Sequence, residues 1–126
     1  MAYSVKKIID VIKENNSCTH LVLTLNGKEF TSGFDVFSWR GSYDMPAVEF
    51  MENDYHMNIE EGNILMKLEN IHGTKVRGYK GGEFILDEDS ILFFVLDESN
   101  SGDATAIVMH EVDLDTIYFY LEPDCY

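Results

Sequence analysis

The chain has 126 residues, of which 45% are hydrophobic and 13% aromatic, and its formal net charge is −14. A chain of this length forms one domain, and its hydrophobic content is typical of a packed globule despite the high charge. No apolar run approaches the roughly 20 residues that span a bilayer. We therefore expect a single soluble domain over residues 1–126, located in the cytoplasm and without a membrane partner.

The acidic residues are concentrated in the later part of the chain. Residues 1–43 contain 4 acidic and 5 basic residues (net +1), whereas residues 44–126 contain 19 and 4 (net −15). Residues 85–126 contain 11 acidic residues and no Lys or Arg. This pattern excludes direct nucleic-acid binding, because phosphates are held by Lys and Arg. Two interpretations stay open: the charge serves solubility alone, or it steers the protein to a basic partner.

The first half of the sequence predicts one helix and two hairpins. Ser4 precedes apolar residues spaced as i, i+3, i+4 and i+7, which predicts an N-capped amphipathic helix over residues 4–16. Asn26-Gly27 favours a two-residue type I′ turn, in which both residues have positive φ. The strands expected in this half are 20–25, 28–34, 34–40 and 47–51.

The second half predicts another helix followed by a series of strands. Asn58 is placed to cap a helix that runs to about residue 71, and Gly73 ends it. The apolar run 91–96 does not alternate, which is typical of a central strand buried on both faces. The other expected strands are 74–79, 83–86, 105–112 and 116–121. The fold class expected is therefore α+β, with an antiparallel sheet of about eight strands and two amphipathic helices packed on it.

Two glycine-flanked stretches combine cations with aromatic side chains, and we expect them to meet in space. Glycines allow backbone N–H groups to approach an anion closely, and a neighbouring aromatic ring offers a stacking surface. This composition favours a site for a nucleotide-like anion. The alternative is that the glycines are ordinary turn residues. The candidate ligand-binding residues are Arg40, Tyr43, Arg77, Tyr79 and Lys80.

The same two stretches carry a resemblance. Trp39-Arg40-Gly41-Ser42-Tyr43 and Gly78-Tyr79-Lys80-Gly81-Gly82-Glu83 resemble an Arg-Gly-Tyr-Tyr stretch and a Gly-Tyr-Lys-Gly-Gly-Glu stretch in a group of small uncharacterised tailed-bacteriophage proteins. The likeness covers roughly residues 34–110, and Ser42 stands where the group usually has Tyr. It transfers no activity. It implies a phage gene expressed in a bacterial host cell, and hence the host cytoplasm as location.

An acidic surface that imitates a row of phosphates is the main functional hypothesis. On this hypothesis the protein is a non-enzymatic inhibitor that binds the basic surface of a host protein, such as a nucleic-acid-handling or defence factor. The binding or sequestering of a small nucleotide-like anion is the alternative, and a small hydrolase is the third. The candidate partner-binding residues are Asp87, Glu88, Asp89, Asp97, Glu98, Asp113 and Asp115.

No pattern predicts a metal, a cofactor or a catalytic group. Residues 97–102 imitate the first half of a calcium-binding EF-hand loop, but position 12 of that loop is Val108 where a bidentate Glu is required. The four histidines lack the paired spacing of a zinc site, and no Ser or Cys has the context of a nucleophile. Cys18 and Cys125 are expected to be unpaired thiols. A homodimer stays open, because an exposed edge strand can pair with a second copy.

Overall fold

The computed structural model describes residues 2–32, 34, 37–39, 45–53, 55–77, 83–96 and 105–123, with the backbone alone at 37–39, 45–47, 49, 51, 76, 77, 84 and 96. The helices are α1 (Val5–Glu14) and α2 (Ile64–Glu69). Neither is long and apolar enough to cross a membrane. The strands of the described part are β1 (His20–Leu25), β2 (Lys28–Ser32), β3 (Phe37–Trp39), β4 (Met45–Glu52), β5 (Met57–Asn58), β6 (Lys75–Arg77), β7 (Glu83–Ile85), β8 (Phe93–Leu96), β9 (Thr105–Asp113) and β10 (Thr116–Pro123).

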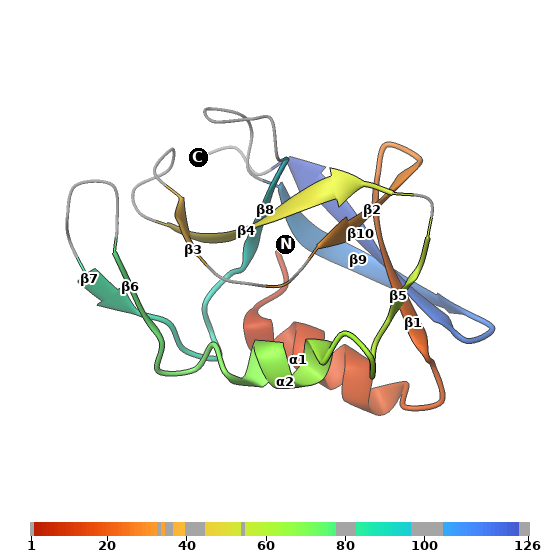
Figure 1. Ribbon diagram of the computed structural model, residues 1–126, viewed down its shortest axis with the longest axis horizontal. Helices are drawn as coiled ribbons and strands as arrows, with labels where there is room; N and C mark the ends of the chain where they lie inside the picture. Colours follow the sequence, from red (N-terminus) through yellow and green to blue (C-terminus); the bar gives the residue numbers. More distant parts are fainter. Residues whose placement is uncertain are drawn as a thin grey trace.

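The main sheet curls until its two ends meet (Figure 1). Its hydrogen-bonded order is β10-β9-β8-β4-β2-β1, and β1 also pairs with β10, so these six strands form a closed ring. Two pairs in the ring, β1 with β10 and β4 with β8, are parallel, and the others are antiparallel. The short strands β3 and β5 pair with β4 and β1, while β6 and β7 form a separate hairpin. The ring thus has an inside, which holds the core, and an outside.

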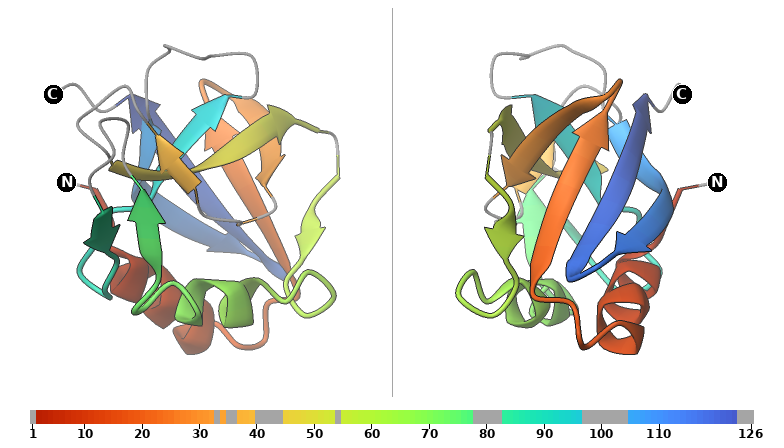
Figure 2. Two further views of the ribbon diagram at one scale, coloured as in Figure 1. Left: turned by 60° about the vertical axis from the view of Figure 1, so that its left-hand side comes forward. Right: turned by 90° about the vertical axis from the view of Figure 1, so that its right-hand side faces the viewer.

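The inside of the ring is filled by side chains that alternate along the strands. Leu21 and Leu23 of β1, and Ile117 and Phe119 of β10, are fully buried in one core cluster that also contains Ile8 of α1. Both helices lie together at one end of the ring, at the bottom of Figures 1 and 2. Burying each such side chain contributes about 1.5–3 kcal/mol. The helices therefore close one open end of the ring and complete its core.

Helix α1 is anchored at its first turn by a distant part of the chain. Ser4 Oγ accepts a backbone N–H of that turn at 3.1 Å, as its position before the helix predicted. The N–H groups of Val5 and Lys6 donate to the carbonyl oxygens of Ser90 and Glu88, at 2.9 Å each. The first N–H groups of a helix have no partner within the helix. These three bonds satisfy them and hold residues 87–90 against α1.

Several local predictions are confirmed. Asn26 and Gly27 have φ of 53° and 80°, as a type I′ turn requires. Strand β8 lies between β4 and β9, and its Phe93 and Phe94 are 0% exposed, so the apolar run is a central strand buried on both faces. The α+β class with two helices is confirmed as well.

The predicted sheet is wrong in its details. The prediction was an antiparallel sheet of about eight strands with helices on one face. The structure has a curled mixed sheet, built on the six strands of the ring, and the helices cover the end of that ring. The physical reason is that the alternation of hydrophobic and polar residues along a strand indicates which side chains face the core. The same alternation occurs whether the neighbouring strand is parallel or antiparallel, so it does not predict the strand pairing. Only the pairing of β1 with β10 creates the closed ring.

The second helix is shorter than predicted. It was expected to be capped by Asn58 and to run to about residue 71. Asn58 Oδ1 does accept the Glu61 N–H, at 2.8 Å, but the bond stabilises a turn that precedes the helix. Asn63 then adopts a left-handed conformation, with φ of 50°. A left-handed residue cannot lie inside a right-handed helix. Helix α2 therefore begins only at Ile64.

Candidate functional site

Most of the predicted ligand-binding residues lie outside the described part of the chain. This holds for Arg40, Tyr43, Tyr79 and Lys80, and for Arg77 the backbone alone is described, at the end of β6. Strands β3 and β6, which lead into the two glycine-flanked stretches, are in contact with each other. The small-ligand site stays a prediction.

The acidic turn (residues 87–90) has a structural role of its own. Asp87 Oδ1 accepts the Asp89 N–H at 2.9 Å and lies 3.3 Å from the hydroxyl of Ser90, which donates to it. The Asp87 N–H in turn donates to Ser90 Oγ at 3.1 Å. This turn presents the carbonyl groups that bind the first turn of α1, and negative charge there is favoured by the helix dipole. The turn's three carboxylates, those of Asp87, Glu88 and Asp89, are exposed. Their place on the surface follows from the structural role of the turn and needs no partner to explain it.

The hairpin end (Asp113, Leu114 and Asp115) joins β9 to β10 and differs from the acidic turn. Leu114 is 92% exposed and has a φ of 56°. A positive φ is unfavourable for a residue with a Cβ atom and usually persists where the surroundings impose it. Phe34 also has a positive φ, but it is 2% exposed and packs edge-on against Phe94. The side chain of Leu114 makes no comparable contribution to folding.

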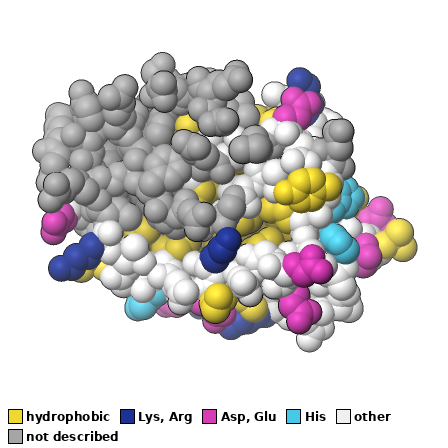
Figure 3. Space-filling model, viewed as in Figure 1, with side chains coloured by type: hydrophobic (Ala, Val, Ile, Leu, Met, Phe, Trp, Pro, Cys, Tyr) yellow, Lys and Arg dark blue, Asp and Glu magenta, His cyan; other side chains and the backbone are white. Residues whose placement is uncertain are grey.

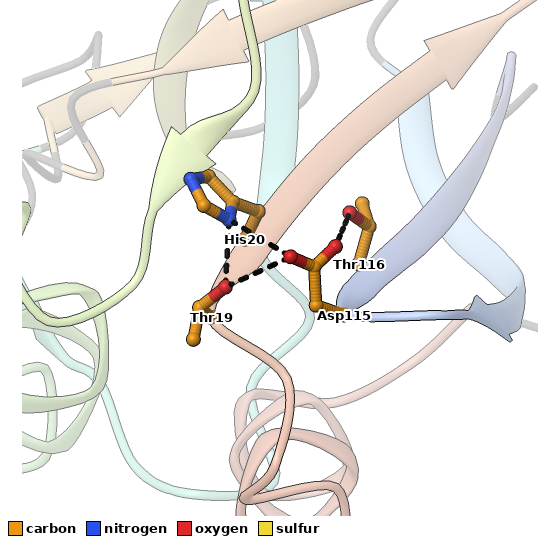
Figure 4. A network of polar contacts seen from close by, with 4 residues as sticks. All are labelled: Thr19, His20, Asp115 and Thr116. Atoms are coloured by element: carbon orange, nitrogen blue, oxygen red, sulfur yellow. Dashed lines mark hydrogen bonds and ion pairs between the residues drawn. The ribbon is translucent and has the colours of Figure 1, made fainter.

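A network of polar contacts holds the hairpin end on the start of β1 (Figure 4). The Asp115 carbonyl accepts the N–H groups of Thr19 and His20, at 2.8 and 3.1 Å. Its carboxylate accepts from the Thr116 hydroxyl at 3.1 Å and from the Thr19 hydroxyl at 3.5 Å. Leu114 therefore projects from a well-anchored base.

The same network does not resemble a nucleophilic triad, although it contains Thr, His and Asp. Thr19 Oγ1 lies 2.7 Å from His20 Nδ1, and Asp115 Oδ2 lies 4.0 Å from the same nitrogen atom. In a triad the two groups contact opposite nitrogens, so that the imidazole accepts a proton on one while the carboxylate orients it through the other. This network is suited to positioning the hairpin end.

A groove of about 730 Å³ lies on the outside of the ring. We call it the outer groove. It runs between the β1–β2 turn and strands β9 and β10, and its described lining contains no Lys or Arg. The residues that line it are Thr24, Asn26, Gly27, Glu29, Val108, Met109, Tyr118, Tyr120, Leu121 and Glu122.

Carboxylates surround the two tyrosines of the outer groove. Burial and the nearby charge of Glu29 raise the pKa of Tyr118 above its usual range, and Asp113 and Asp115 add to this. Burial and the charge of Glu111 raise the pKa of Tyr120, which also shares a hydrogen bond with Glu111. Both tyrosines therefore keep their hydroxyl protons at neutral pH, which leaves the groove with aromatic rings and negative charge.

His56 of the neighbouring β5 region orients Glu29 at the edge of the groove. Its Nε2 atom lies 3.3 Å from Glu29 Oε1, and its ring packs edge-on against Tyr118 at a centroid distance of 6.0 Å. The opposite face of β2 carries Lys28, whose Nζ lies 3.8 Å from Glu52. The side chain of Lys28 thus faces away from the groove.

A second groove, of about 650 Å³, is lined by residues of both α1 and α2. Its lining includes the hydrophobic side chains Ile12, Leu65 and Met66 and the free thiol of Cys18. Burial and the charge of Asp115 raise the pKa of Cys18, so the thiol stays protonated and is a weak nucleophile. Within the described residues no group of three or more His, Cys, Asp or Glu could hold a metal ion.

Comparisons of this chain with protein families, curated proteins and solved structures find no match. The candidate site therefore rests on its own geometry.

The structure brings together only part of the predicted partner-binding set. Asp113 and Asp115 lie at the hairpin end, Asp87, Glu88 and Asp89 lie beside the first turn of α1, and Asp97 and Glu98 lie outside the described residues. Sequence reasoning did not identify Leu114, Tyr118, Tyr120 or Glu29 as site residues. The alternation of Ile117, Phe119 and Leu121 with Tyr118 and Tyr120 was the available signal, since it places both tyrosines on one face of the strand.

Proposed function

We propose that this protein is a non-enzymatic, phage-encoded binding protein that holds a basic surface of a host protein and thereby inhibits it. The contact is made by the hairpin end together with the adjoining outer groove. The host cytoplasm is the compartment in which this binding takes place. The resemblance of its glycine-flanked stretches to tailed-phage proteins supports the phage origin.

The observation that carries the proposal is the exposure of Leu114. A large hydrophobic side chain that is 92% exposed, at a backbone conformation that glycine or asparagine adopts more easily, does not serve the stability of the isolated domain. Interfaces are typically built from a hydrophobic anchor with polar residues around it. Leu114 lies between Asp113 and Asp115, and Figure 3 shows hydrophobic and acidic side chains together at the end where this hairpin lies.

The charge around the anchor favours a basic partner. Glu29, Glu111 and Glu122 extend the negative charge of the hairpin end along the outside of β2, β9 and β10. Complementary charge accelerates association and disfavours acidic competitors. A host protein that normally holds nucleic acid offers such a surface.

Affinity capture from a bacterial host extract, with elution by a salt gradient, tests the proposal. The tagged protein is compared with Leu114→Gly, with Asp113→Asn/Asp115→Asn, and with the control Glu88→Gln/Asp89→Asn, which removes two exposed charges from the acidic turn beside the first turn of α1. We expect one stoichiometric basic protein. It should elute at lower salt from the Asp113/Asp115 variant, because fewer charges attract it. Loss of the anchor in Leu114→Gly should weaken binding by about tenfold or more.

The purified partner is then assayed with and without the protein, and we expect its activity to fall in proportion to the amount bound. Elution that is insensitive to salt would contradict the charge argument. Equal elution of all variants and the control would contradict the assignment of the hairpin end. A bound partner whose activity is unchanged would contradict inhibition.

A further inference from the structure

The outer groove has a shape and chemistry that indicate what it binds. Leu21 and Leu23 of β1 face the core, so Thr24 faces outward. In the strand register Glu29 of β2 lies opposite Thr24, Thr24 lies opposite Tyr120 of β10, and Tyr120 lies opposite Met109 of β9. These four side chains form one row across four strands. Tyr118, two residues from Tyr120 along β10, faces the same way and lies opposite Glu111.

An irregularity in the sheet lies within the lining of the groove. Tyr120 pairs with Met109, but the next residue, Leu121, pairs with Ile107, so Val108 is left over in the register. A bulge of this kind bends the strand and increases its twist. Val108, Met109, Tyr120 and Leu121 all line the groove. The bulge therefore lies directly beside the two tyrosines, where the pairing of β9 with β10 is interrupted.

We propose that the outer groove binds the guanidinium group of an arginine side chain, which is stacked on a tyrosine ring and paired with the Glu29 carboxylate. This inference rests on the proposed function, because the arginine belongs to the basic partner. A cation is attracted to the face of an aromatic ring, and the flat guanidinium group can stack there while it donates several hydrogen bonds to carboxylates. A volume of about 730 Å³ lies within the usual range of binding pockets.

The surroundings favour arginine over other occupants. An anion is excluded, because Glu29 and Glu122 line the groove and no described lining residue is Lys or Arg. A purely apolar group would cover the exposed part of both carboxylates without offering either of them a hydrogen-bond donor. Lysine carries the charge, but its compact and strongly hydrated ammonium group does not stack. His56 holds Glu29 Oε1 at 3.3 Å, so the carboxylate is positioned before the ligand arrives.

A titration of the whole chain with capped Gly-Arg-Gly, followed by the NMR resonances of β10, tests this assignment. Two matched probes carry lysine and citrulline, the latter being an uncharged analogue of the same shape as arginine. We expect saturable shifts with the arginine peptide, at least about tenfold weaker binding of citrulline, and intermediate binding of lysine. Tyr120→Leu and Glu29→Gln should each weaken arginine binding by about tenfold. The control Glu14→Gln, which removes one exposed charge from α1 at the other end of the ring, should leave it unchanged.

Each failure has a distinct meaning. The inference is overturned if the arginine peptide causes no saturable shift, if citrulline binds equally well, or if Glu29→Gln and Glu14→Gln behave alike. Equal affinity for lysine overturns the guanidinium assignment. In all these cases a captured partner that still depends on Leu114 would leave the proposed function intact. A specific arginine site in a protein that captures no partner would instead contradict the proposed function and leave the site standing.

Discussion

The acidic turn and the hairpin end are both short, exposed and rich in aspartate, yet they do different things. In the acidic turn the Asp87 carboxylate accepts bonds from within the turn, and the turn's carbonyl groups bind the first turn of α1. At the hairpin end the contacts of Asp115 fix the base of the loop, while Leu114 projects beyond it. The sequence presents both as clusters of negative charge. Their hydrogen bonds distinguish a part of the scaffold from a surface available to a partner.

Replacing Asp87 tests the structural half of this comparison and has the largest expected effect. Asp87→Ala removes the acceptor of two hydrogen bonds and should lower the free energy of unfolding by about 1–2 kcal/mol. Asp87→Asn keeps the accepting oxygen and removes only the charge, so it should cost a few tenths of a kcal/mol. Urea denaturation of both variants measures the difference. Equal stability of the two would mean that charge, and not the hydrogen bonds, is what the turn contributes.

At the hairpin end, replacing Leu114 is expected to increase stability, whereas replacing Asp87 in the acidic turn is expected to decrease it. Leu114→Gly should raise the free energy of unfolding by about 1 kcal/mol, because glycine adopts a positive φ without the steric cost of a Cβ atom. Leu114→Ala is the matched control, since it shortens the side chain but keeps the Cβ atom and so keeps the strain. Thermal melts of the three proteins measure the effect. A Gly variant that is less stable than the Ala variant would remove the argument that Leu114 is retained for binding.

The two tyrosines of the outer groove give a smaller effect that depends on pH. Their pKa values are raised in the folded protein, so the folded state favours the protonated form. The resulting stability is fully present below the ordinary tyrosine pKa of about 10 and is lost as the pH rises through the folded value. The free energy of unfolding should therefore decline above about pH 10. The double variant Tyr118→Phe/Tyr120→Phe should show a shallower decline, and an identical decline would contradict the environment assigned to these side chains.

Features set by neighbouring residues were predictable from the sequence. The cap at Ser4, the turn at Asn26-Gly27 and the buried run around Phe93 depend on a few adjacent positions, and each is found in the structure. In these cases the local preference and the final fold agree. The prediction of the α+β class follows from the same signals.

Features set by distant residues were not predictable. The parallel pairing of β1 with β10 brings His20 opposite Thr116, and no spacing within either strand indicates that partner or its direction. The outer groove has the same origin, because Glu29 and Tyr120 become neighbours only through Thr24 between them. Leu114 was missed for another reason: the turn residues that favour a positive φ are Gly and Asn, and a leucine gives no such signal.

The closed ring also bears on how the chain reaches its folded state. Its final pair joins strands at opposite ends of the sequence, and contacts between such distant residues carry a high loop-closure entropy, which slows folding. Strand β1 is an inner strand of the finished sheet, but it remains an edge until β10 has paired with it. An unpaired edge is a template on which another chain can add. In the native ring β1 and β10 cover each other's edges. A chain in which this pair has not yet formed exposes both edges, so it is this incompletely folded form that is prone to aggregation.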